Sequence, residues 1–109
     1  MLFVPSWRVE HDVVRGTTTT RAGLAMQFTT PTGAVLQSQH DYVARVGAGE
    51  RAEPELEAEL ALDVIQDGDV IRVRTSERMT GDTVELRSVV TMNDEERYRG
   101  EWRRAWRAP

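Results

Sequence analysis

The sequence contains no cysteine and no lysine. Without cysteine the chain cannot form a disulfide framework, a thiolate nucleophile or a cysteine-ligated metal site. All of its 14 basic residues are arginines, and 18 acidic residues give a net charge of -4. This balance gives no support to a general affinity for nucleic acid or for an acidic membrane surface.

Long apolar runs are also missing. No run approaches the roughly 18 residues that a membrane-spanning helix needs, and residues 1–5 carry no basic segment. We therefore expect a soluble protein without a membrane partner; its location is unknown, and cytoplasmic by default. A length of 109 residues predicts a single domain, 1–109, with one core.

Turn residues divide most of the chain into short alternating segments. The turns at 66–69, 80–82 and 93–95 each separate runs that are rich in valine, isoleucine, leucine and threonine, which is typical of hairpins. Further turns are expected at 31–33 and 47–49. The strands predicted by this pattern cover residues 7–13, 17–28, 34–46, 53–65, 70–77, 83–92 and 97–106.

The segment 53–65 could be read in two ways. Its glutamate, leucine and alanine content favours a helix, and Leu56, Leu60 and Val64 stand four apart. Against this, apolar residues alternate with acidic ones at a period of two, which favours a strand with one wet face. We interpret it as a strand. The fold class expected is all-β, a single antiparallel sandwich or barrel-like domain of about seven strands.

The expected core follows from the same alternation. We predict that eleven apolar side chains close a small interior and leave little room for a ligand. They are Leu36, Leu56, Leu60, Leu62, Val64, Ile71, Val73, Val84, Leu86, Val90 and Met92.

Catalytic motifs are not found. There is no Gly-x-Ser-x-Gly elbow, so we predict no catalytic residue, no enzyme activity and no cofactor. The two histidines, His11 and His40, lack a metal-binding spacing, and we favour structural roles in which each pairs with a hydroxyl or a cross-strand partner. Ser38, His40 and Tyr42 share one face of a predicted strand. With Trp102 they could line a shallow pocket, which is the alternative function, a small-molecule-binding barrel.

Charged clusters also have simple structural interpretations. The glutamates at 53, 55, 57 and 59 lack the spacing of a calcium loop and alternate as a solvated strand face would. The C-terminal segment interleaves arginines with Tyr98, Trp102 and Trp106, as a nucleic-acid binder would. The acidic strand at 55–63 offers a counter-charge, so we expect the arginines of 97–104 to pair with acidic side chains on a neighbouring strand or subunit. Trp102 would then anchor the apolar face, and Trp106 would lie near an exposed interface.

Several of these segments together resemble a known family. The chain is similar to the C-terminal non-catalytic region of the cocaine esterase and X-prolyl dipeptidyl-peptidase family of serine hydrolases. The segments that carry the likeness are Trp7, 12–17, 38–42, 58–62, 69–75, 78–82 and 98–102. The resemblance implies a jelly-roll-like accessory region that packs on a hydrolase domain. The family's Ile-Pro-Arg exit is replaced here by residues 105–107, and no catalytic segment is present to carry over a triad.

Two functions therefore stay open. In the first, the chain is a non-catalytic β-sandwich accessory or interaction module whose partner is a hydrolase domain or a second copy of itself. In the second, it binds a small ligand near Ser38, His40 and Tyr42. Because the predicted core fills the interior, we favour the module.

Overall fold

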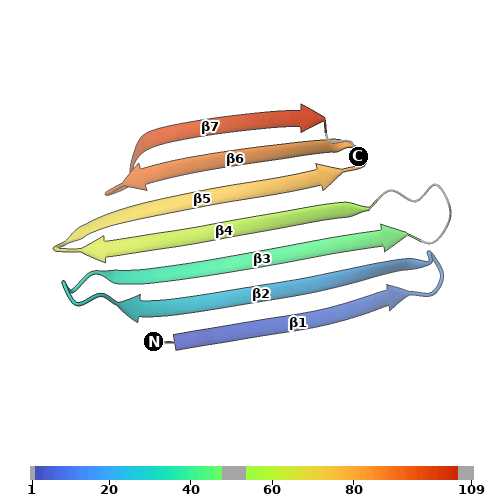
Figure 1. Ribbon diagram of the computed structural model, residues 1–109, viewed down its shortest axis with the longest axis horizontal. Coiled ribbons are helices and arrows are strands. Elements are labelled where there is room, and N and C mark those ends of the chain that lie inside the picture. Colours follow the sequence, from blue (N-terminus) through green and yellow to red (C-terminus); the bar gives the residue numbers. More distant parts are fainter. Residues whose placement is uncertain (1, 48–53, 106–109) are drawn as a thin grey trace.

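Seven antiparallel strands make up the protein (Figure 1). The computed structural model describes residues 2–47 and 54–105. Strands are β1 (Leu2–Asp12), β2 (Thr17–Thr29), β3 (Val35–Gly47), β4 (Glu55–Gln66), β5 (Asp69–Thr80), β6 (Thr83–Met92) and β7 (Glu95–Ala105). The all-β prediction is confirmed, and so is the contested assignment of residues 53–65 over the part that the structure describes.

The strands form one open sheet in the order of the sequence. Each strand pairs with its sequence neighbours, as in an up-and-down meander, and among the described residues β1 and β7 do not meet. The chain measures 54 × 29 × 26 Å. A flat layer would be only about 10 Å deep, so the sheet is not flat. One chain thus supplies a single layer, and a sandwich needs a second.

Tight turns fix the register of the hairpins. Asp67 and Gly68 between β4 and β5 have φ of 51° and 83°, and Asn93 and Asp94 between β6 and β7 have φ of 52° and 66°. Two successive positive φ values are the type I′ geometry that matches strand twist. At the β2–β3 connection, Gly33 takes φ of 89°, as expected for a glycine in the permissive turn position.

A side chain also links two turns at one end of the sheet. The Asn93 carboxamide oxygen accepts a hydrogen bond of 2.8 Å from the Val70 amide, and its nitrogen donates to Asp69 Oδ1 at 2.9 Å. The Asn93 amide donates to the Val70 carbonyl at 2.9 Å. These bonds tie the β6–β7 turn to the start of β5.

The sheet edges carry features that discourage further strand pairing. β1 begins at Leu2, earlier than the predicted start at Trp7, and it contains Pro5. An edge strand tolerates a proline because one side has no neighbour to receive an N–H. On the other edge, β7 has a register shift opposite Val90 and Thr91 and carries many arginines and glutamates. Bulges, prolines and charges are devices that keep edge strands from pairing.

The predicted core is not enclosed by one chain. The eleven apolar side chains share one face of the sheet, yet Ala34 is the buried hydrophobic residue of the described chain, and Ile71 is exposed. The reason is that alternation assigns a side chain to a face but says nothing about what covers that face. The expectation of a closed interior within this chain was therefore wrong.

Candidate functional site

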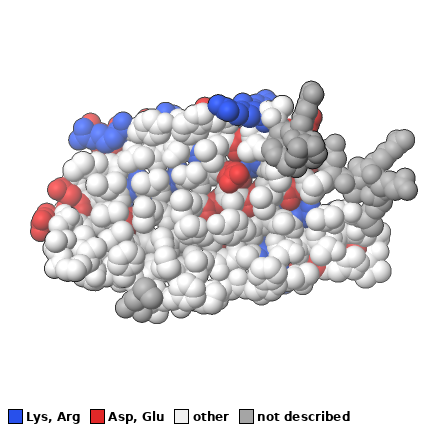
Figure 2. All heavy atoms as spheres, in the orientation of Figure 1, with Lys and Arg blue, Asp and Glu red and all other residues white. Residues whose placement is uncertain are grey.

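The main candidate is one whole face of the sheet, which we call the apolar face. Cross-strand partners lie on the same side of a sheet, so the register defines it. The line Trp7, Ala22, Tyr42, Ala58, Glu77, Leu86 and Trp102 crosses all seven strands on this face. Above and below it lie the core residues predicted from the sequence. The side of the molecule seen in Figure 2 is made largely of uncharged residues.

The apolar face is only partly covered. Trp7 is 73% exposed, Tyr42 43% and Trp102 44%. The 12.4 kDa chain has an accessible surface of 8356 Å², whereas a compact monomer of this mass exposes about 6,100 Å². Its radius of gyration is 17.5 Å, against about 13 Å for a compact domain of this length. The excess surface, roughly 2,200 Å², is consistent with a single layer whose faces are both open, the apolar face among them.

The residues of the predicted pocket are only partly brought together. Ser38, His40 and Tyr42 do share the apolar face of β3, and His40 Nδ1 lies 3.2 Å from the Tyr42 hydroxyl. Trp102 is on the same face but on β7, four strands away. Trp102 cannot close a pocket with Ser38, His40 and Tyr42, because β4, β5 and β6 lie between β3 and β7. Trp106 lies outside the described residues.

The histidines have structural partners. His11 Nδ1 lies 2.9 Å from Thr18 Oγ1, and His40 pairs with Tyr42. These contacts confirm the predicted pairing with hydroxyl groups. Asp41 follows His40 in the sequence, but alternation puts it on the opposite face, where it accepts a hydrogen bond from Gln39 at 3.0 Å. His40 and Asp41 therefore do not form a dyad, and no cluster of three or more metal-binding side chains occurs within 2–47 and 54–105.

An aromatic pair covers a glycine at the far edge of the apolar face. Gly100 lies on β7 between Tyr98 and Trp102, and a Cβ built there would overlap the Trp102 ring and the Tyr98 hydroxyl. Both side chains thus lie over the glycine backbone, an arrangement that restores packing where a strand lacks a side chain. The spacing Tyr98-x-Gly100-x-Trp102 is the sequence signal for it.

The opposite face, which we call the polar face, is held by ion pairs. Arg74 contacts Asp63 at 2.7 Å, and Glu57 lies 3.8 Å from Arg45 and 3.9 Å from Arg78. The carboxylates of β4 therefore pair with arginines of β3 and β5. The Glu57 pairs are largely exposed, so each contributes little to stability, whereas the Asp63 side chain is only 22% exposed.

The C-terminal arginines also pair, though not with β4. Arg103 lies 3.5 Å from Glu85 on β6, and Arg99 lies 2.7 Å from Glu96 on its own strand. The predicted pairing with a carboxylate on a neighbouring strand is confirmed for Arg103, whereas Arg99 pairs within β7. The β4 carboxylates, offered as their counter-charge, are three strands away from β7. With their charge balanced locally, these arginines do not form an unpaired basic patch.

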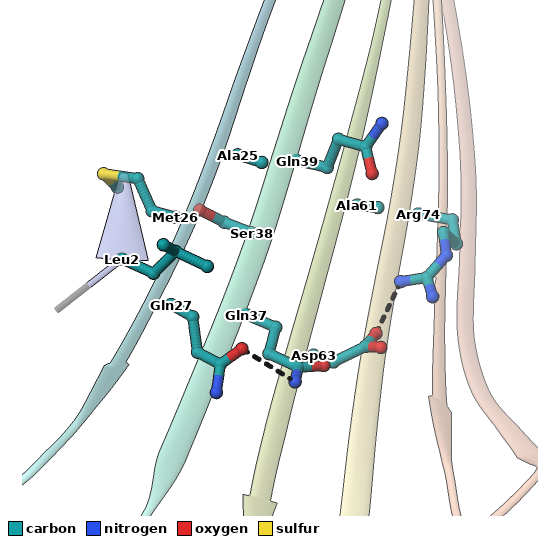
Figure 3. A pocket seen from close by; sticks show the side chains of 10 residues that line it. All are labelled: Leu2, Ala25, Met26, Gln27, Gln37, Ser38, Gln39, Ala61, Asp63 and Arg74. Carbon is teal, nitrogen blue, oxygen red and sulfur yellow. Dashed lines mark hydrogen bonds and ion pairs between the residues drawn. The ribbon is translucent and has the colours of Figure 1, made fainter. Parts of the chain in front are cut away.

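A shallow hollow of about 280 Å³ lies on the polar face (Figure 3). Its floor has the small residues Ala25 and Ala61, and around it stand Gln27, Gln37 and the Arg74–Asp63 pair. Gln37 donates to Gln27 at 3.4 Å. Sequence reasoning did not find this hollow; the signal was the alanines among long polar side chains.

Comparison with protein-family models, curated proteins and solved structures gave no match. The resemblance to the acyl esterase family therefore stays a prediction. Within the described residues the structure has no helix of the length and apolarity needed to cross a membrane.

Proposed function

We propose that this chain is a non-catalytic β interaction module whose apolar face is a protein contact surface. The observation that carries the proposal is the combination of an apolar face on all seven strands with the absence of any fully buried large side chain on it in the described chain. A sheet with one apolar face needs a second layer to remove that face from water. Exposed apolar patches of this extent typically mark interaction sites.

The arrangement of the side chains that could act in catalysis supports the proposal that the module is non-catalytic. Ser38 and His40 lie two residues apart on one strand, and the imidazole contacts the Tyr42 hydroxyl. The nearest carboxylate in sequence, Asp41, is on the other face of the sheet. A nucleophile, a base and an orienting acid must lie within hydrogen-bond reach of one another, which this arrangement does not provide.

The accessory role beside a hydrolase rests on the sequence resemblance. A β-layer with one apolar face is suited to such a role, because it can pack against the surface of a larger domain. The apolar face is the part of the chain that would make this contact.

Two alanines on β4 offer a matched test. Ala58 is on the apolar face and Ala61 is on the polar face; both are half-buried, and the chain has no native cysteine. We would measure the rate at which a monofunctional maleimide labels Ala58→Cys and Ala61→Cys in extracts of the cells that make the protein. Each rate is divided by the rate in urea. We expect cysteine 58 to react at least roughly tenfold more slowly than cysteine 61. Equal normalised rates would remove the contact-surface function.

A further inference from the structure

We propose that the layer covering the apolar face is a second copy of this chain, packed face to face about a two-fold axis that runs along β4. This inference rests on the proposed function and names the partner. It concerns the described strands β1 to β7, whose apolar side chains occupy one side of the sheet.

The area of the surface fits a stable dimer. Each chain exposes roughly 2,200 Å² more than a compact monomer of its mass, so two chains together would hide at most about 4,400 Å². Interfaces of about 2,000–5,000 Å² are typical of obligate homodimers. Most oligomers of this kind have two-fold symmetry, in which the same patch of both copies meets itself.

The edges of the sheet argue against the other way of joining two copies. Edge-to-edge pairing would need a free, regular edge on β1 or β7. β1 carries Pro5, Arg8 and Glu10, while β7 has a register shift and a dense row of charges. These features oppose strand addition, which leaves the faces as the surfaces available for association.

One charged residue in the middle of the apolar face indicates how the copies are oriented. Glu77 lies on β5 on the line that joins Tyr42, Ala58 and Leu86, and it makes no ion pair within the described part of the chain. Covering a lone carboxylate with apolar atoms is costly unless the cover provides a hydrogen-bond donor. The covering layer must therefore present a polar group opposite Glu77.

A second copy presents a polar group opposite Glu77 when the two-fold axis runs along β4. The axis then exchanges the neighbours of β4, so that β5 of one copy faces β3 of the other. Glu77 and Tyr42 lie at the same height on either side of Ala58, so Glu77 comes to lie over Tyr42 and near His40 of the second copy. The hydroxyl and the imidazole are both partners for a carboxylate.

The usual angle between packed sheets preserves this match. Aligned sheets cross at about 30°, and β5 lies about 4.8 Å from β4. The crossing therefore displaces Glu77 from its partner by about 2–3 Å. A long carboxylate side chain can cover that distance.

Cross-linking the purified chain tests the arrangement. Residue 58 of one copy would lie directly across the two-fold axis from residue 58 of the other, in layers about 10 Å apart. With a short bifunctional thiol reagent, we expect cysteine 58 to react slowly, and we expect the chains that do react to be joined as covalent dimers. The matched Ala61→Cys chain, whose thiol points away from the partner, should stay monomeric. A failure of cysteine 58 to cross-link at micromolar concentration would overturn the second-copy inference.

Charge substitution tests the orientation separately. Glu77→Arg places a cation opposite His40, and we expect the dimer dissociation constant to rise at least roughly tenfold. Ser76→Arg, on the neighbouring position of the polar face, is the control and should change it less than about threefold. Glu77→Gln keeps a hydrogen-bonding group, so its dimer dissociation constant should lie between those of the two arginine variants. Equal effects of the two arginine substitutions would contradict the axis along β4.

The labelling and cross-linking results together distinguish the second-copy inference from the proposed contact-surface function. Cysteine 58 that is protected in extracts but does not cross-link when purified means that another protein covers the face, so the inference fails and the function stands. If cysteine 58 is neither protected nor cross-linked, both fail.

Discussion

Trp7 on β1 and Trp102 on β7 lie on one register line and on the same face, at opposite edges of the sheet (Figure 1). Their side chains are 73% and 44% exposed. An axis along β4 would bring β1 of one copy over β7 of the other, with Trp7 and Trp102 about 7 Å out of line at a crossing of about 30°. The apolar face thus extends across the full width of the sheet.

Tryptophan emission should follow from this arrangement. In a chain that carries Trp7→Phe and Trp106→Phe, Trp102 is the single reporter. We expect its emission to shift to the red, and its quenching by acrylamide to increase, when the dimer is diluted to monomer. Emission that is independent of protein concentration across the dissociation range would contradict the burial of Trp102 in the dimer.

Substitutions on the two faces of β4 should differ in cost. Leu60→Ala should lower the free energy of unfolding by about 2–4 kcal/mol at concentrations where the face is covered. Glu57→Ala removes only exposed ion pairs with Arg45 and Arg78, so we expect a loss of about 0–1 kcal/mol. Urea denaturation of both variants measures this difference. Equal losses would show that Leu60 remains in water.

Asn93 should stabilise the β6–β7 turn in two ways, through its side-chain hydrogen bonds and through its tolerance of a positive φ. Asn93→Ala removes two side-chain hydrogen bonds and places alanine at a positive φ, so we expect a loss of about 2–3 kcal/mol. Asn93→Gly keeps the turn conformation and should lose about 1–2 kcal/mol. Thermal unfolding ranks the two variants. Equal losses would assign the whole effect to hydrogen bonding.

Gly100 should resist substitution because aromatic side chains lie over it. In Gly100→Ala the new Cβ would overlap Trp102 and Tyr98, and the rings must move to make room. We expect a loss of about 1–2 kcal/mol and a change in near-ultraviolet circular dichroism. Ser88→Ala, at the cross-strand partner of Gly100, controls for position. An unchanged spectrum would show that the rings do not cover the glycine.

The chain alone should not turn over short aryl esters. Among the described residues of one chain, Ser38 and His40 form no hydrogen bond with a carboxylate, so any slow hydrolysis by the monomer should be unaffected by Ser38→Ala or His40→Ala. Steady-state assays of the three chains check this. Activity that disappeared in either variant would contradict the non-catalytic function.

The sequence was sufficient to predict the strands and the face of each side chain. Alternation across Glu59, Leu60 and Ala61 outweighed helix propensity because the period of two decides which residues share a face. The turns at Gly33 and Gly68 were predicted because their positive φ values favour glycine. The start of β1 was missed, since Pro5 is tolerated only where a strand has an open edge.

The order of the strands and the layer that covers the apolar face could not be predicted from the sequence. A one-face apolar pattern is the same whether the covering layer belongs to the chain or to a partner, so the closed core was expected where a single layer exists. Placing Trp102 beside Ser38, His40 and Tyr42 required the strand order, which alternation does not encode. The hollow around Ala25 and Ala61 depends in the same way on which strands are neighbours.

Sedimentation equilibrium of the unmodified chain tests the central claim most directly. A face-to-face dimer should have a mass of twice 12.4 kDa at micromolar concentration, with dissociation that is coupled to loss of structure or to exposure of the apolar face. A stable, cooperatively folded species of 12.4 kDa over the same concentrations would contradict it.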